Sequence, residues 1–163
     1  MTSDTTATPP SQPDAGGTNE SPAIMINGQY IRDFSFEAPN APAIFNELKA
    51  PPEVTISVDI EVRKLQATIY ESALEFHIEG RTPDKVAFIL EMTYCAVATI
   101  NVPPEHVEPI LLIEIPRLLF PFARSVIADI TRDSGFPPLL LAPIDFVAMY
   151  RQRTERGAST TVN

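Results

Sequence analysis

The 163-residue chain lacks tryptophan and contains one cysteine, two histidines and six glycines. A single cysteine cannot form an internal disulfide, and without a cluster of Cys and His the sequence has no structural zinc site. The few glycines form neither a GxGxxG nor a GxxxxGK[ST] motif, so the usual phosphate-binding loops are missing. Neither histidine has a Ser or Cys nucleophile motif nearby. We therefore expect no enzyme, no cofactor and no metal ion.

Basic residues are also scarce, with 12 Lys and Arg against 21 Asp and Glu and a net charge of −9. Nucleic-acid binding needs a basic face that neutralises phosphates, so we expect no nucleic-acid partner. The longest strongly apolar run is broken by Glu114, Pro116 and Arg117, which argues against a membrane span. The N-terminal MTSDTTATPP has no basic or strongly apolar region of a secretory signal. We expect a soluble, cytoplasmic protein.

Proline is abundant, with 17 residues, and its positions divide the chain. Residues 1–23 are rich in Thr, Ser, Pro, Gly, Asp and Ala and contain no Lys, Arg or aromatic residue, so we expect a disordered N-terminal tail. Residues 154–163 are expected to be a flexible C-terminal tail. A single domain is expected at 24–153, because 44% of the chain is apolar and can supply one core.

Alternating apolar and polar residues predict the strands. The pattern is clearest at 54–63, where Val and Ile alternate with polar side chains, as in a half-buried strand. Similar runs at 68–81 and 86–100 are separated by short turns and predict an antiparallel meander. Residues 24–37 predict a further strand. The four prolines of 38–52 predict a long crossover loop with one helical turn at most.

The spacing of apolar residues changes after the last strand. Residues 105–133 predict a long helix that is bent at Pro116 and Pro121 and capped by Gly135. A short helix from 145 to about 153 would follow. Strands followed by helices predict an α+β fold with one sheet and one helical layer.

The long helix is apolar on nearly all sides, and such helices are buried on most sides. A domain of this size has little material to cover a second helix face, so we expect self-association. The alternative is a helix buried within its own subunit, under the final helix and loops.

One face of the sheet is expected to gather carboxylates with little basic compensation. Simple alternation places Arg32 with Phe34 on the other face. This surface is either an ordinary solvated face or a docking surface for a basic partner, with Ile89 as an apolar point beside Glu91. The carboxylates expected on it are Asp33, Glu37, Glu71, Glu75, Glu79 and Glu91.

Four sequence segments carry a resemblance to a known family. They are DFSFEAPNAP at 33–42, PPEV at 51–54, LLFPFARSVIADIT at 118–131 and GFPPLLLAPIDF at 135–146. In this order they resemble the SecB family of bacterial protein-export chaperones, over roughly 24–153. The resemblance implies a four-stranded antiparallel sheet with two helices, assembled as a dimer of dimers, a homotetramer with helices between the sheets.

The resemblance also implies a function. SecB-like proteins are ATP-independent chaperones that hold non-native precursor proteins in a translocation-competent state and deliver them to the SecA motor. An alternative is a SecB-like chaperone dedicated to a single client such as an antitoxin. An enzyme on a similar scaffold is a third possibility, for which the sequence offers no site.

Site residues follow from the same resemblance. The positions that match SecA-binding residues are Asp33, Glu37, Ile89 and Glu91. The positions that match client-binding residues are Val54, Ile56, Val58, Phe146, Met149 and Tyr150. The alternative for the three strand residues is ordinary core packing. Many relatives carry a tryptophan before the PPEV segment, whereas residues 46–50 here are NELKA.

Overall fold

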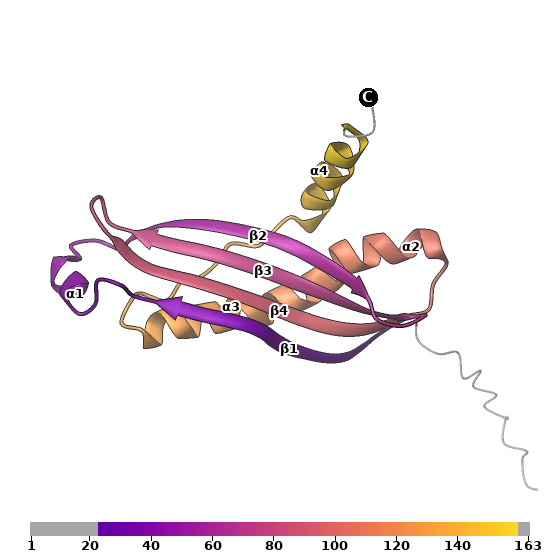
Figure 1. Cartoon of the computed structure of the whole chain (residues 1–163), viewed down its shortest axis with the longest axis horizontal. Helices are drawn as coiled ribbons and strands as arrows, with labels where there is room; N and C mark the ends of the chain where they lie inside the picture. The colour runs from indigo at the N-terminus through magenta and orange to yellow at the C-terminus, as the bar shows by residue number, and fades with distance from the viewer. Residues whose placement is uncertain (1–22, 160–163) are drawn as a thin grey trace, which may run out of the picture.

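The computed structural model describes residues 23–159, with side chains through Arg156 (Figure 1). The predicted tail at 1–23 lies outside these residues except for Ala23. Four antiparallel strands form one sheet in the order β1-β4-β3-β2. The strands are β1 (Ile24–Glu37), β2 (Glu53–Lys64), β3 (Ile69–Arg81) and β4 (Val86–Ile100). The predicted meander of the last three strands is confirmed, and the crossover from β1 to β2 carries the one-turn helix α1 (Ala43–Glu47).

Strand β1 contains two irregularities in its pairing with β4. The register shifts between Ile26 and Gly28 and again between Ile31 and Asp33. An extra residue at a bulge reverses the alternation of side chains along the strand. As a result, Arg32 lies on the opposite face from Phe34, so the simple alternation assumed from the sequence is wrong at this position.

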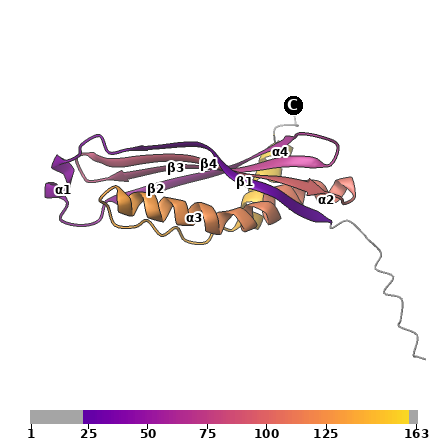
Figure 2. The same ribbon diagram turned by 90° about the horizontal axis from the view of Figure 1, so that it is seen from below.

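One face of the sheet is covered by a continuous helical segment that follows β4 (Figure 2). The segment consists of α2 (Pro104–Pro109), the π-helical turn η1 (Ile110–Glu114) and α3 (Ile115–Asp133). Its side chains pack with those of β3 and β4 in a core that includes Leu74, Leu90, Ile115 and Leu119, each fully buried. The opposite face carries no helix in the described part of the chain, and we call it the outer face.

The long helix is irregular before Pro116 rather than after it. Across η1, the N–H of Ile115 donates to the carbonyl of Ile110, five residues back. Such a π turn gives space to the proline that follows, whose ring lacks an N–H and crowds the preceding turn. Within this irregular stretch, Ser72 Oγ of β3 donates to Leu111 O at 3.0 Å. Helix α3 continues through Pro121, as one long helix requires, and the bend expected there stays a prediction.

Gly135 ends α3 as predicted, with a positive φ of 90°. Its N–H donates to Arg132 O and the N–H of Phe136 donates to Thr131 O, which together form a Schellman cap. The buried Thr131 Oγ1 also accepts the N–H of Leu139 at 2.9 Å. This bond holds the extended segment that leads to the last helix against the end of α3.

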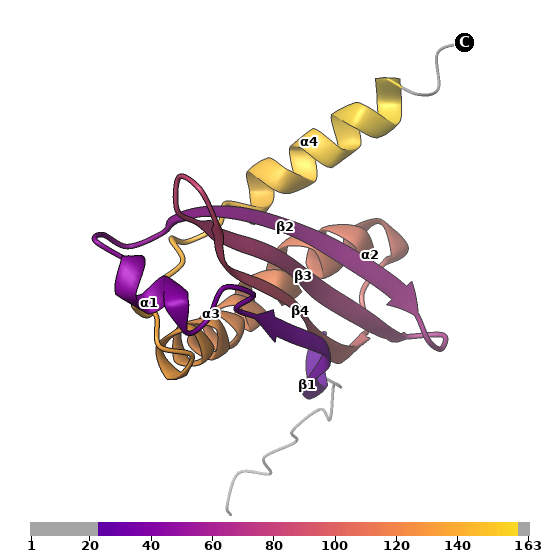
Figure 3. The same cartoon turned by 60° about the vertical axis from the view of Figure 1, so that its left-hand side comes forward.

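Helix α4 (Phe146–Ser159) projects beyond the β2 side of the sheet (Figure 3). Asp145 precedes it as predicted, and its Oδ1 accepts the N–H of Ala148 at 2.9 Å. The helix continues to Ser159, six residues past the predicted end near Arg153. The residues after Arg153 include good helix formers and no proline, so no stop signal lies at that position. No helix within residues 23–159 has the length and apolar character needed to cross a bilayer.

Candidate functional site

A groove of about 750 Å³ lies between strand β2 and helix α4, and we call it the β2 groove. It brings together Ile56 and Val58 of β2 with Met149 and Tyr150 of α4. These are four of the six client-binding positions expected from the sequence. Ile56 is 44% exposed, which is high for an isoleucine in a strand. The groove therefore presents apolar side chains to solvent from two elements that are far apart in the sequence.

The other two expected positions do not line this groove. Phe146 is 2% exposed and its ring packs edge-on against Phe120, with centroids 6.1 Å apart, so it anchors the start of α4 in the core. Val54 is partly buried near the start of β2 and packs against the core. Their role in client binding stays a prediction.

Several residues of the β2 groove were not anticipated from the sequence. Leu112 of η1, together with Leu141 and Ile144 of the segment before α4, forms part of its wall. Because the long helix is apolar on almost every side, its sequence did not indicate which residue would reach the groove. For Leu141 the sequence did offer a signal, because the apolar, proline-containing crossover at 136–143 was expected to border a groove.

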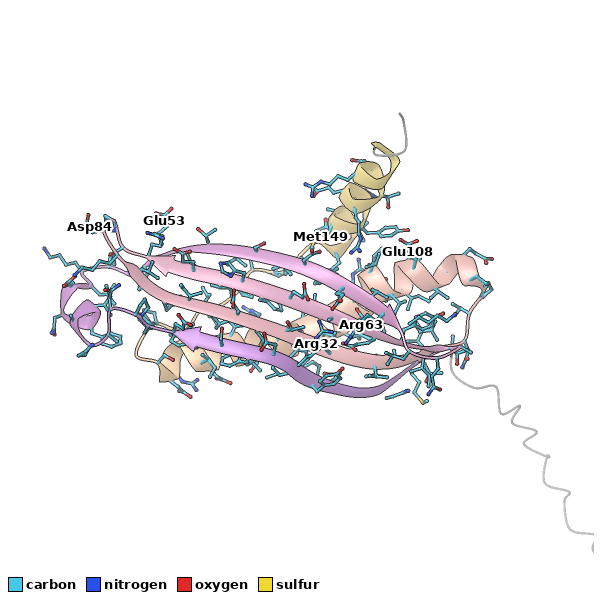
Figure 4. All side chains as sticks on the ribbon, in the orientation of Figure 1. Arg32, Glu53, Arg63, Asp84, Glu108 and Met149 are labelled. Carbon is cyan, nitrogen blue, oxygen red and sulfur yellow. The ribbon has the colours of Figure 1, made fainter. Side chains whose placement is uncertain are left out.

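A second hollow, of about 490 Å³, lies between the β2–β3 hairpin and α2, and we call it the hairpin groove. Its apolar wall includes Val62, Tyr70 and Val107, and its charged residues are Lys64, Glu108 and Arg153. It shares Leu112 and Arg153 with the β2 groove. Met149 on α4 and Glu108 on α2 mark the two grooves in Figure 4.

Ile60, at the edge of the sheet, has both of its backbone polar groups bound. Arg153 Nη1 donates to Ile60 O at 2.7 Å, and the N–H of Ile60 donates to Asp59 Oδ1 at 2.7 Å. Both partners lie outside strand β3, so these backbone groups point away from the sheet. The guanidinium of Arg153 is thereby fixed at the edge of β2.

The expected docking residues lie near one another on the outer face. In the pairing of β1 with β4, Glu37 is opposite Ile89, and Ser35 between Asp33 and Glu37 is opposite Glu91. On the other side of β4, His77 Nδ1 contacts Glu91 Oε1 at 3.0 Å. The register thus brings Asp33, Glu37, Ile89 and Glu91 onto one part of the outer face.

The rest of the outer face has more basic compensation than we expected. Arg32 contacts Glu61 at 2.5 Å, Glu71 at 2.7 Å and Glu75 at 3.4 Å. Arg63 also contacts Glu71, at 2.7 Å, and both arginines lie over the same face of the sheet (Figure 4). The bulge in β1 turns Arg32 toward this face, which the sequence pattern did not show.

Two carboxylates of the predicted acidic face remain without a cation. Glu79 is paired with Arg81, and Glu91 with His77 where that ring is protonated. Among the described residues, Asp33 and Glu37 have no basic group within 4.0 Å. The uncompensated charge therefore lies along the end of β1, beside Ile89, and does not extend over the whole sheet.

Glu71 lies at the centre of the paired region and is 4% exposed. Burial acts to raise its pKa, but hydrogen bonds from Cys95 and Arg63 and the positive charges of Arg63 and Arg32 outweigh it, so its pKa is lowered. Burial, together with the hydrogen bond to Glu71, raises the pKa of the Cys95 thiol to about 11. The carboxylates of Glu61, Glu71 and Glu75 form ion pairs with Arg32 or Arg63. Within residues 23–159, no group of three or more His, Cys, Asp or Glu residues could hold a metal ion.

Comparison with known proteins decides the family. The family described as preprotein translocase subunit SecB matches residues 17–157. The chain belongs to the SecB family. The SecB match covers both grooves and the outer face. It also agrees with the fold described above, since a four-stranded sheet with a long helix and a shorter last helix was expected from the resemblance to SecB.

Individual SecB relatives match along nearly the whole chain. The "Protein-export protein SecB" of Rhodospirillum rubrum is 55% identical over 96% of this chain and 93% of its own. The protein of the same name from Paramagnetospirillum magneticum is 52% identical over 81% of this chain and 86% of its own. Among solved structures, a SecB-like chaperone of Mycobacterium tuberculosis in complex with an antitoxin peptide has a TM-score of 0.64 at 13% identity. It covers 75% of this chain and 91% of its own, and at that identity it shows the shared fold alone.

Proposed function

We propose that this SecB protein is an ATP-independent chaperone of the cytoplasm, which holds non-native precursor proteins in a translocation-competent state and delivers them to the SecA motor. Relatives at up to 55% identity carry the name protein-export protein, which supports a role in export. These relatives are stronger support for the function than the chaperone of the antitoxin complex, which is only 13% identical to this chain. A broad export role is therefore favoured over dedication to one antitoxin.

The open β2 groove is the observation that carries the proposal. Its apolar wall joins the edge strand β2 to helix α4, with Ile56 largely exposed at the edge. An open apolar groove suits unfolded chains, because such chains expose aliphatic and aromatic side chains in many different sequences. Burying those side chains in the groove would keep them from collapsing into a folded precursor core. No nucleotide is required for this step.

The test is the refolding of a denatured precursor in the presence of the chaperone and the absence of ATP. We expect refolding to slow, and we expect Ile56→Asp to weaken precursor capture by about fivefold or more, since a buried interface anchor contributes more than ~1 kcal/mol. Leu65→Asp is the matched control. Leu65 is 47% exposed in the β2–β3 turn and lines neither groove. Equal capture by both variants would contradict the role of the β2 groove.

SecA docking is proposed for the end of the outer face that carries Asp33, Glu37, Ile89 and Glu91. The two unpaired carboxylates give this surface a negative field beside an apolar side chain, which suits a basic partner. We expect Glu91→Lys to weaken SecA binding while precursor capture stays intact. Glu105→Lys on α2 changes the net charge equally but lies outside the outer face. Normal SecA affinity in the Glu91 variant would overturn this assignment.

We also propose that the protein is a homotetramer, a dimer of dimers. Leu118 and Phe122, one turn apart on α3, are 50% and 52% exposed although the neighbouring Leu119 is fully buried. Exposed apolar side chains one turn apart favour packing against another helix. Light scattering of purified Phe122→Glu should show a smaller species than the wild type. A tetramer of unchanged stability in this variant would contradict a role for this face.

A further inference from the structure

The N-terminal segment, residues 1–22, is attached to the rest of the chain beside the hairpin groove. The carbonyl of Ala23 accepts the N–H of Asn101 at 2.8 Å. The two neighbours of Asn101, which are Ile100 and Val102, both line this groove. The start of β1 also lies at the same end of the molecule as the β2–β3 turn and helix α2 (Figures 1 and 2). A segment that leaves from Ala23 therefore has the hairpin groove as its nearest hollow.

The N-terminal segment is long enough to enter this groove. Ten residues, 13–22, separate Ala23 from the proline cluster of the segment. An extended chain spans ~3.3 Å per residue, so the cluster can lie anywhere within about 30 Å of Ala23. A tether of this length holds its own end at an effective concentration in the millimolar range. Even a weak fit to the groove would then be populated.

The proline cluster has the chemistry that such a groove binds. Residues 8–14 read TPPSQPD, in which Pro10 and Pro13 have the PxxP spacing. Segments of this kind dock in grooves with aromatic walls, because the fixed φ of proline leaves little backbone entropy to lose on docking. The hairpin groove offers the half-buried ring of Tyr70 together with Val107.

Charge favours the same occupant. The charged residues of the hairpin groove are Lys64, Arg153 and Glu108, so cations exceed carboxylates there. Lys64 Nζ lies over the Tyr70 ring, 5.7 Å from its centroid. Residues 1–22 contain three carboxylates and no Lys or Arg, and Asp14 directly follows the last proline of the cluster. A proline cluster against the ring would bring this carboxylate toward the ammonium group.

We propose that residues 8–14 dock in the hairpin groove of their own chain and compete there with client segments. A client that buries large aliphatic and aromatic side chains displaces the proline cluster, whereas a segment with little apolar surface does not. The N-terminal segment thus raises the affinity that a polypeptide needs in order to be held. The inference rests on the proposed chaperone function and adds an intramolecular competitor to it.

The first experiment measures the affinity of a fluorescent peptide composed of Leu, Phe and Ser by anisotropy. A variant that lacks residues 2–20 should bind this peptide about threefold to fivefold more tightly than the full-length protein, because the competitor is gone. The combined substitutions Pro9→Ser, Pro10→Ser and Pro13→Ser should have the same effect. Deletion of residues 2–7 alone is the control, since it shortens the segment but keeps the proline cluster, and it should leave the affinity unchanged.

The second experiment locates the docked segment by disulfide formation. Ser11→Cys is combined with Ala67→Cys, which lies in the wall of the hairpin groove, and the native Cys95 is buried. Mild oxidation should give a bond within one chain, seen as a monomer band on a denaturing gel. Leu65→Cys in place of Ala67→Cys is the control, because Leu65 is in the same turn but lines neither groove, and its bond should form more slowly.

Equal peptide affinity of the full-length protein and the variant without residues 2–20 would overturn the competition and leave the chaperone function standing. A covalent dimer on the gel would show that the segment docks on a second copy, against the assignment to its own chain. Failure of both folded proteins to bind the peptide would instead count against the chaperone function as well.

Discussion

Arg32 on β1 and Glu71 on β3 are separated by strand β4, yet their Nη1 and Oε1 atoms lie 2.7 Å apart over the outer face. Arg63 on β2 reaches the same carboxylate from the other side, at 2.7 Å. A single buried carboxylate thus connects side chains from three strands. Because the arginines neutralise the centre of the outer face, its uncompensated negative charge is confined to the end of β1.

Replacing Arg32 with Met should destabilise the fold. Glu71 would keep Arg63 but lose one of its two cations in a site where it is 4% exposed. Breaking a buried ion pair costs roughly 3–5 kcal/mol, and with Arg63 still present we expect about 1–3 kcal/mol. Urea denaturation measures the loss. Arg117→Met, which removes an exposed pair with Glu114, should change stability by less than about 0.5 kcal/mol.

The same site predicts how stability depends on pH. The pKa of Glu71 is lower in the folded chain than its ordinary value of 4.5, so the unfolded chain binds the proton more readily. The stabilisation is fully present above pH 4.5 and is lost as the pH falls through the lowered folded value. In Glu71→Gln, urea midpoints should therefore fall less steeply on acidification below pH 4.5 than in the wild type. Parallel curves for the two proteins would contradict this assignment.

Gly80 has no space for a side chain. A Cβ at this position would lie 2.8 Å from Cδ1 of Phe88, whose ring stacks on Phe36 with centroids 5.7 Å apart and is 2% exposed. Gly80→Ala should destabilise the protein by about 1–3 kcal/mol through overpacking. Gly28→Ala is the matched strand control, since nothing lies within 4 Å of a Cβ there. Thermal unfolding should show a loss for the first variant and little change for the second.

Cys95 should be unreactive in the folded protein. Its side chain is fully buried and its thiol has a pKa of about 11, so at pH 8 about one thiol in a thousand is ionised. A chromogenic disulfide reagent at pH 8 should react slowly with the native protein and rapidly after unfolding in urea. Rapid labelling of the native state would show that the outer face opens over Cys95.

The sheet could be predicted from the sequence because period-two alternation is a local signal. Residues 54–63 alternate almost without exception, and the observed strand β2 spans Glu53–Lys64. The bulge near Arg32 could not be predicted, since it depends on pairing with β4. The extent of α4 was underestimated because residues 154–156 are exposed and show no apolar periodicity that would mark a continuing helix.

The candidate site was predicted only in part. Resemblance to SecB supplied Ile56, Val58, Met149 and Tyr150, which the fold brings together in the β2 groove. Arg153 was expected only as the end of the final helix, because a basic residue there has no local feature that indicates its partner. That partner is the carbonyl of Ile60, 93 residues earlier in the chain, and only the folded backbone brings the two together.

Helix α4 changes in character along its length. Phe146 is buried in the core, residues 147–150 are half-buried, and residues 151–156 are exposed. One wall of the β2 groove is therefore built from a segment whose attachment depends on its first turn. Substitutions in the exposed turns beyond it would change the wall of the groove without touching the buried Phe146. On α4, the residue that anchors the helix and the residues that face the groove are therefore different, although the opposite wall includes core residues such as Ile60 and Leu112.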